Sequence, residues 1–230
     1  MTEMQSRPIE VTVENMEKYE KSDTYYFIKR CIDLILSFIG IIVFSPIMLI
    51  VTAAIKLDSK GSVIFSQMRV GKNGKLFKMY KFRSMVDDAE ELLDNLRSKN
   101  EMTGPMFKIK EDPRITRVGK FIRRTSIDEL PQLFNVIKGD MSLVGPRPNL
   151  PHEVAKFTEC QKAKLLVKPG LTCYWQVMGR SNIDFEHWMK LDIKYIEDRN
   201  TLLDLKLIFK TFWVFLEMTE LHRYKVCVIL

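Results

Sequence analysis

The chain has 230 residues, of which 46% are hydrophobic and 28% charged, and its formal net charge is +7. This balance excludes a disordered chain and a protein with many membrane spans, and the length allows one globular domain beside a membrane segment. The excess of Lys and Arg suits an anionic partner, such as nucleic acid, a membrane surface or a phosphorylated substrate. The four cysteines, at positions 31, 160, 173 and 227, lack zinc-site spacing, so we expect free thiols.

An apolar segment without a charged residue runs from position 34 to position 55. As a helix it would cover about 33 Å, enough to cross a bilayer core of about 30 Å. Pro46 stands near its middle and has no amide hydrogen to donate to the carbonyl of Ile42. We therefore expect a kink there, with the Ser45 hydroxyl bonded to the freed carbonyl.

Basic residues flank both ends of this apolar segment. Lys29 and Arg30 precede it, and Lys56 and Lys60 follow it. The positive-inside rule places both ends on the cytoplasmic side, as in a re-entrant hairpin, but prolines also occur in helices that span the membrane. The two topologies stay evenly balanced at this point. Asp33, one turn after Arg30, predicts a helix start near the membrane interface.

A β-hairpin is predicted next, with strands over residues 63–70 and 76–85 and a turn at Asn73-Gly74. Lys81 and Arg83 are two positions apart in the second strand, so they share one face. They are either solvated cations of that strand or a pair directed at a phosphate group.

Helices account for most of the remaining pattern. Residues 86–97 predict an acidic amphipathic surface helix, and Thr116 predicts the cap of a short basic helix that ends at Arg123 and Arg124. Residues 167–180 predict a turn, a strand and a loop, and helices follow over 184–198 and 201–218. The last helix is either part of the core or lies in a membrane interface.

Two adjacent carboxylates, Asp128 and Glu129, stand at or just before a helix start. Ser126 and Glu129 match a capping box, which gives these acids a purely structural interpretation. Pro131 argues against that box, because a helix start nearer Leu130 would place the proline at the first helical position. A capping role and a catalytic role therefore both remain open for Asp128 and Glu129.

The same segment continues to an arginine with restricted backbone freedom. Gly139 predicts the end of the helix, and a strand is predicted over residues 141–144. Arg147 follows between Pro146 and Pro148, which hold its backbone extended. A guanidinium presented in this way suits bidentate contact with phosphate.

Together these stretches resemble a known family. KFRSM (81–85), the segments 104–133, 138–148 and 168–180, and an apolar helix broken by Ser-Pro resemble the small bacterial sugar transferases, which are polyprenyl-phosphate hexose-1-phosphate transferases. The resemblance covers residues 25 to about 216 and looks like the minimal, monotopic form. It implies an α+β fold: a re-entrant membrane helix hairpin, then a compact, mainly helical cytoplasmic domain with a small β-hairpin and short strands.

The resemblance also implies roles for single residues. The family's Ser-Pro pair matches Ser45-Pro46, which favours the hairpin. Its dyad matches Asp128 as nucleophile and Glu129 as ligand of Mg²⁺. Lys81 and Arg147 match positions near the phosphate, and we add Arg83 as a third cation for the substrate. Arg123 and Arg124 either orient the dyad or are surface cations. The chain departs from the family pattern at Cys173, Ser181 and Arg199-Asn200.

We accordingly expect a polar arm over residues 1–24, a re-entrant helix over 25–60, a catalytic domain over 61–218 with interfacial helices, and a tail over 219–230. The implied reaction moves a sugar-1-phosphate from a UDP-sugar to polyprenyl (undecaprenyl) phosphate and releases UMP, in ping-pong fashion through an aspartyl intermediate. It would begin capsule, exopolysaccharide or glycan assembly at the cytoplasmic face of the bacterial membrane.

The rival interpretation is a basic, membrane-bound interaction protein without catalysis. Nucleic-acid binding is not expected, because zinc-finger spacing and RNP-type aromatic motifs are missing from the sequence. The sugar, the pathway and the oligomeric state stay open, a homodimer included.

Overall fold

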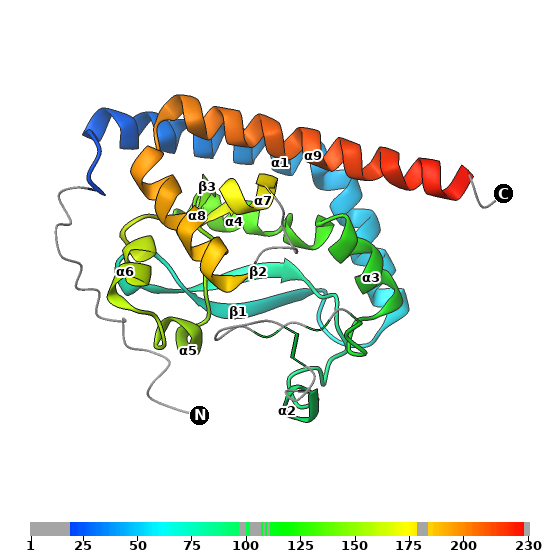
Figure 1. Cartoon of the computed structure of the whole chain (residues 1–230). Helices are drawn as coiled ribbons and strands as arrows, with labels where there is room; N and C mark the ends of the chain where they lie inside the picture. The colour runs from blue at the N-terminus through cyan, green and yellow to red at the C-terminus, as the bar shows by residue number, and fades with distance from the viewer. Residues whose placement is uncertain are drawn as a thin grey trace.

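The structure is a computed structural model that describes residues 19–96, 100–101, 107, 109, 111–178 and 184–227, except the side chains of 94 and 215–227. Most of the expected polar arm, residue 181 and the last residues of the expected tail lie outside this description. Two long helices, α1 (Asp23–Asp58) and α9 (Thr201–Cys227), run side by side across one face of the molecule, with the smaller elements beneath them (Figure 1).

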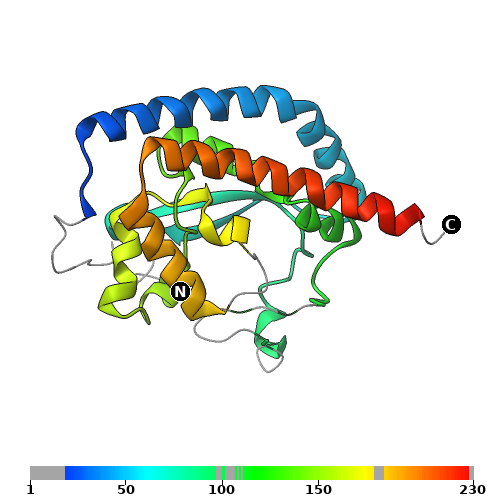
Figure 2. The same cartoon turned by 45° about the horizontal axis from the view of Figure 1, so that its top comes forward.

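Helix α1 begins well before the apolar segment. The Ser22 side chain caps it by accepting a hydrogen bond from the Tyr25 amide, so the start suggested near Asp33 is wrong, and α1 begins close to the first residue of the expected range 25–60. Ser45 Oγ donates to the Ile42 carbonyl at 2.8 Å, which confirms the predicted use of the group that Pro46 leaves free. Figure 2 shows the light-blue end of α1 bending away from the line of its first half. By length and composition α1 is the one described helix that is apolar enough to cross a membrane.

The predicted hairpin is confirmed. Strands β1 (Ile64–Val70) and β2 (Leu76–Phe82) pair antiparallel around the short 3₁₀ turn η3 (Lys72–Gly74). Asn73 and Gly74 both have positive φ, 55° and 74°, which is the backbone that Asn-Gly adopts most easily.

The predicted helix over 86–97 is largely wrong. Of its described residues only α2 (Leu93–Leu96) is helical, and residues 87–92 form turns. The buried Arg114 explains the difference, because its backbone carbonyl accepts from the Val86 amide and its guanidinium donates to the Ala89 carbonyl. These contacts with a distant segment hold the chain in turns despite its helical periodicity.

The predicted helix boundaries around the dyad are partly confirmed. Thr116 caps α3 (Arg117–Arg124) through the Gly119 amide at 2.9 Å, as expected. Ser126 does not form the capping box, because it takes a left-handed conformation with φ of 51°. Helix α4 (Gln132–Lys138) starts directly after Pro131 and ends at Gly139, whose φ of 89° confirms the predicted stop.

Short elements complete the domain. Strand β3 (Ser142–Val144) pairs in parallel with β4 (Gly170–Thr172), an arrangement that needs a long crossover between them. That crossover holds α5 (Pro151–Val154), α6 (Glu159–Lys162) and the 3₁₀ helix η6 (Ala163–Leu166). The small helix α7 (Tyr174–Met178) lies where a loop was expected.

The last two helices follow the prediction closely. Asp184 caps α8 (Phe185–Asp198) through the His187 amide at 2.7 Å. Helix α9 begins at Thr201 as predicted but continues to Cys227, past the expected end at Met218. Its faces differ: Leu207 is buried at 3% exposure, whereas Trp213 is 63% exposed, so α9 contributes both to the core and to an apolar surface.

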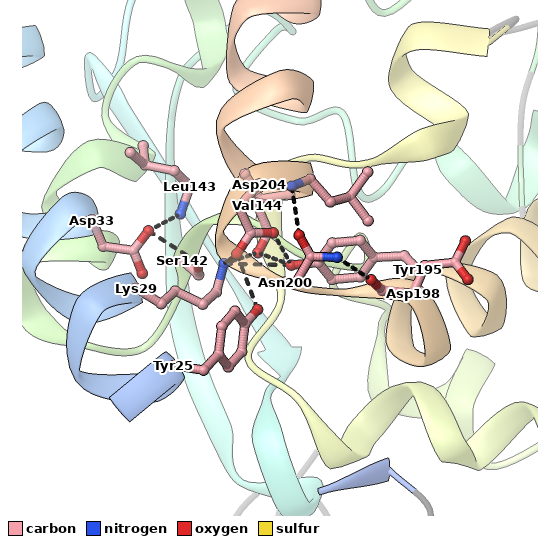
Figure 3. Close-up of polar contacts among 11 residues, drawn as sticks. Tyr25, Lys29, Asp33, Ser142, Leu143, Val144, Tyr195, Asp198, Asn200 and Asp204 are labelled. Carbon is pink, nitrogen blue, oxygen red and sulfur yellow. Dashed lines mark hydrogen bonds and ion pairs between the residues drawn. The ribbon is translucent and has the colours of Figure 1, made fainter. Parts of the chain in front are cut away.

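A buried polar network joins α1 to α9 (Figure 3). Lys29 Nζ lies 2.9 Å from the Asp204 carboxylate, which also accepts from the hydroxyls of Tyr25 and Tyr195. Asp33 accepts from the Ser142 hydroxyl and the Leu143 amide, so it ties α1 to β3. Asp33 therefore contacts a strand far along the chain rather than Arg30, the neighbour on its own helix that the sequence suggested.

Candidate active site

The dyad lies on a tight turn between two helices. The left-handed turn at Ser126 leads into the 3₁₀ helix η5 (Ile127–Glu129), which carries both acids. The Asp128 side chain is nearly buried, with 9% of its surface exposed, and the Glu129 side chain is 18% exposed. Because η5 is a single short turn, the two adjacent carboxylates do not project from the face of a regular helix.

Two predicted cations meet the dyad. Lys81 Nζ, from β2, donates to Glu129 Oε1 at 2.7 Å, and Arg147 Nη1 lies 3.5 Å from the same oxygen. Arg147 follows β3, so two segments, β2 and the one after β3, meet at Glu129 on η5. A narrow pocket beside them is lined by Met79, Lys81, Glu129, Gln132, Arg147, Pro148, Gly170, Leu171 and Trp175.

Burial changes the titration of these groups. It raises the pKa of Asp128 to about 6, while the nearby Lys81 charge works in the opposite direction and Glu129 adds to the rise. A carboxyl with a pKa of about 6 is still mostly ionised at neutral pH. Burial also lowers the pKa of Lys81, although the Glu129 carboxylate opposes that shift. The site thus holds a weakly solvated carboxylate beside fixed cations.

Sequence reasoning missed the aromatic support of Arg147. Its guanidinium lies 5.6 Å from the ring centre of Trp175 on α7 and 6.0 Å from that of Trp188 on α8. The two indoles contact each other, with centres 4.8 Å apart. Cation–π contacts of this kind restrict the guanidinium and leave its edge directed at an anion. No sequence spacing relates these tryptophans to Arg147, so only the structure reveals this contact. We call Trp175 and Trp188 the tryptophan platform.

The structure does not bring Arg83 to the dyad. Its guanidinium is buried and donates to the backbone carbonyls of Ser59, Lys60 and Ser62, which follow the end of α1. The sequence interpretation placed Arg83 on the face of Lys81, but the strand ends at Phe82 and that alternation stops there. Arg83 therefore holds the C-terminal end of α1 against the hairpin.

We expect Arg83→Lys to lower stability by about 1.5–3 kcal/mol, because an ammonium group cannot replace three diverging donors. Thermal unfolding in detergent measures this loss. Arg117→Lys, at an exposed position of α3, is the matched control and should leave the unfolding midpoint unchanged. Equal midpoints for the two variants would contradict the anchoring role.

Arg123 and Arg124 are exposed on the last turn of α3. The Arg123 charge lowers the pKa of Asp128, although less than Lys81 does. Arg124 lies over the ring of its neighbour Phe121, with 6.0 Å between the guanidinium carbon and the ring centre. Arg123 therefore acts on Asp128 only through the electrostatic effect of its charge, and Arg124 is a surface residue.

The donor set at the dyad fits Mg²⁺. Among the described residues, no group of three His, Cys, Asp or Glu side chains is arranged to hold a metal ion. Mg²⁺ does not need such a group, because one or two carboxylates suffice when substrate phosphates and water complete its shell. Glu129, with Asp128 beside it, offers hard oxygen donors of this kind.

Comparison with known proteins identifies the sequence pattern as a family pattern. The model of a family described as "Bacterial sugar transferase" matches residues 24–218, which include α1 except its first residue, the dyad, the Arg147 segment and most of α9.

Three relatives are informative. The chain is 49% identical over 189 residues to "Galactosyl transferase CpsE" of Streptococcus agalactiae and 43% identical over 189 residues to "Undecaprenyl-phosphate galactose phosphotransferase" of Salmonella typhimurium. These alignments cover 82% and 80% of this chain but only 42% and 40% of those proteins. The "Exopolysaccharide production protein ExoY" of Sinorhizobium fredii is 36% identical, and there 80% of this chain aligns with 83% of the relative.

Proposed function

Because this chain belongs to the bacterial sugar transferase family, we propose that it transfers a sugar-1-phosphate from a UDP-sugar to undecaprenyl or another polyprenyl phosphate and releases UMP. The observation that carries the proposal is the Asp128–Glu129 pair held beside Lys81 and Arg147. Both substrates are anions, so a site for their reaction needs fixed positive charge to offset their repulsion. The names of the relatives support the substrate classes and a role in exopolysaccharide or capsule assembly.

The reaction has two half-reactions. In the first, an Asp128 carboxylate oxygen attacks the phosphorus that bears the sugar, the bond from this phosphorus to the UMP oxygen breaks, and UMP leaves with the electron pair. In the second, a phosphate oxygen of the polyprenyl phosphate attacks the same phosphorus, and its bond to Asp128 breaks. The carboxylate is regenerated, and the product is a polyprenyl diphosphate sugar.

The other groups bind and orient the substrates. Lys81 and Arg147 would contact the diphosphate of the donor. Trp175 and Trp188 would keep the Arg147 guanidinium in the orientation that this contact needs. Glu129 would hold Mg²⁺, which when bound supplies further positive charge at the phosphates. The poorly solvated Asp128 carboxylate is a better nucleophile than one fully hydrated in water.

UMP release tests this function. Purified protein in detergent, with Mg²⁺ and undecaprenyl phosphate, should release UMP from one member of a panel of UDP-sugars, of which UDP-galactose is the first choice because of the relatives' names. Initial rates at varied donor and acceptor concentrations should give parallel double-reciprocal lines, as expected for ping-pong kinetics. Intersecting lines would reject the two-step mechanism, and lack of UMP release with the whole panel would reject the function.

In this reaction the acceptor phosphate lies at the cytoplasmic membrane surface, so the active site must be held at that surface. A bent α1 that enters and leaves the membrane on the same side would hold it there. We infer that α1 enters one leaflet and returns, with Lys29 and Lys56 both on the cytoplasmic side. The exposed apolar side chains of α1, among them Phe38 at 62% and Leu49 at 70%, support contact with lipid on both sides of the bend. This topology keeps the dyad at head-group level and facing the cytoplasm.

Replacing Ser45 and Pro46 together by Ala and Leu should straighten α1 toward a full span, because Leu restores the amide donor to the Ile42 carbonyl. A tag at residue 1 should then become accessible from outside the cytoplasmic membrane, whereas it stays inside in the parent protein. Protease protection of the tag in spheroplasts measures this. If the tag of the double variant remains cytoplasmic, the bend does not determine topology.

A further inference from the structure

A second and larger cavity lies under the first turns of α1. Its volume is about 350 Å³, within the range of small-ligand sites. It shares no lining residue with the pocket beside the dyad. The proposed reaction uses none of its side chains, so the cavity needs an explanation of its own. We refer to it as the basic cavity, after the residues Lys29, Arg30, Lys72, Lys168 and Arg199 in its lining.

The charges around the basic cavity do not balance. Its lining contains five cationic side chains and one carboxylate, that of Asp33. Lys29 is neutralised by Asp204, at 2.9 Å. The other four cations make no ion pair with a carboxylate among the described residues: Arg30, Lys72, Lys168 and Arg199. Unpaired cations gathered in a partly buried space are costly unless an anion joins them.

The cations are also held close together. A methyl group added at Gly139 would lie 3.6 Å from both Arg30 Nη2 and Lys168 Nζ, so both nitrogens approach the same point beside Gly139. Arg30 is fixed in place, because it donates to the carbonyls of Val136 and Ile137 at the end of α4. Burial, together with the charges of Arg30 and Lys72, lowers the pKa of Lys168, although Asp33 and Asp140 oppose that shift.

Two further contacts complete the lining from other directions. Lys72 reaches over the Tyr26 ring from the hairpin turn, with its nitrogen 5.4 Å from the ring centre. Arg199, only 2% exposed, donates to the Tyr26 hydroxyl and to backbone carbonyls. Arg199 is one of the positions where the chain departs from the family pattern, whereas Lys168 belongs to the segment 168–180 that matches it.

The orientation of α1 relates the basic cavity to the membrane surface. Tyr26, Lys29, Arg30 and Asp33 are spaced by three, four and seven residues, so they share the helix face that lines the cavity. The opposite face exposes apolar side chains, including Phe27 at 71%, Ile35 at 59% and Phe38 at 62%. A helix lying in the interface with that apolar face in the acyl region puts its polar face at the depth of the head groups.

We propose that the basic cavity binds a phosphate-bearing anion, independently of the dyad. The phosphate would lie among Arg30, Lys72 and Lys168, which belong to α1, the hairpin turn and the loop before β4. It would join these three segments and so strengthen the attachment of α1 to the domain. The same chemistry is offered by the head group of an anionic phospholipid and by a soluble phosphate, and the experiment separates these sources.

The test is ligand-dependent thermal stability of the full chain in a neutral detergent. Short-chain phosphatidylglycerol, short-chain phosphatidylcholine and inorganic phosphate are titrated separately, and the rise of the unfolding midpoint gives an apparent Kd. We compare Lys72→Glu with Lys75→Glu, an equal charge reversal at an exposed lysine of the same turn that does not line the cavity. Lys72→Glu should weaken binding about tenfold or more, and Lys75→Glu should leave it near the parent value.

A gain in stability with phosphatidylglycerol alone assigns the basic cavity to a lipid head group, and a gain with inorganic phosphate as well shows that the phosphate group suffices. A gain with inorganic phosphate alone assigns it to a soluble anion. Lys168→Gln, on the other side of the cavity, must reproduce the loss seen with Lys72→Glu. Equal responses of the two charge-reversal variants, no loss in Lys168→Gln, or no stabilisation of the parent protein would overturn the proposal. The assay contains no sugar donor, so its failure is distinct from failure of the proposed transferase function.

Discussion

Asp128→Asn should abolish covalent labelling of the protein and reduce turnover by about 10³-fold or more. An amide is a very weak nucleophile towards phosphorus, so the first half-reaction has no substitute group at this position. The variant should fold, because Asn is close in size to Asp and burial already disfavours the charge of Asp128.

The measurement uses a UDP-sugar with radioactive β-phosphorus, supplied with Mg²⁺ and without acceptor. The parent protein should retain label on the denatured chain, release UMP in a burst, and lose the label on treatment with hydroxylamine, which cleaves acyl phosphates. Asp88→Asn, the same change at an exposed site, should behave like the parent. A parent protein that never carries label, or an Asp128→Asn variant that does, would rule out the aspartyl intermediate.

Asp204→Ala should destabilise the protein by about 3–5 kcal/mol, because it removes one partner of a buried ion pair and leaves Lys29 without a carboxylate. The hydroxyls of Tyr25 and Tyr195 lose the same acceptor (Figure 3). For a chain of this length the loss corresponds to a fall of about 6–20 °C in Tm.

Thermal unfolding in detergent again provides the measurement. Asp198→Ala is the control, since its pair with Lys194 is largely exposed, at 38% and 59%, and such pairs contribute about 1 kcal/mol or less. If both variants unfold at the same temperature, the buried network does not hold α1 against α9.

The prediction of single elements succeeded where the signal lies among chain neighbours. Thr116 caps a helix as expected, Gly139 ends α4, and Asn73-Gly74 turns the hairpin. In each case the hydrogen bond or dihedral angle involves residues within a few positions. The helix predicted over 86–97 failed because the distant Arg114 competes for its carbonyl and amide groups.

In the candidate site, too, the sequence predicted features of neighbouring residues better than contacts between distant ones. Asp128 and Glu129 are adjacent in the chain, and Pro146 and Pro148 constrain Arg147 locally, so the order of residues suggests them as candidates but leaves a capping role open for the acids. The alternation of side chains along β2 predicted that Lys81 and Arg83 would share a face. In the structure Lys81 contacts Glu129, whereas Arg83 donates to the carbonyls that follow α1. The strand ends between these two residues, and tertiary contacts decide the orientation of the second.

The sequence alone determined the apolar helix with its proline, the hairpin, the Thr116 cap and the acidic pair, because periodicity, turn chemistry and capping act over one or two turns of chain. Only the tertiary structure decided the parallel pairing of β3 with β4, the tryptophans beneath Arg147 and the basic cavity under α1. These features join residues many positions apart, and their partners are selected by how helices and strands pack, which no local pattern encodes.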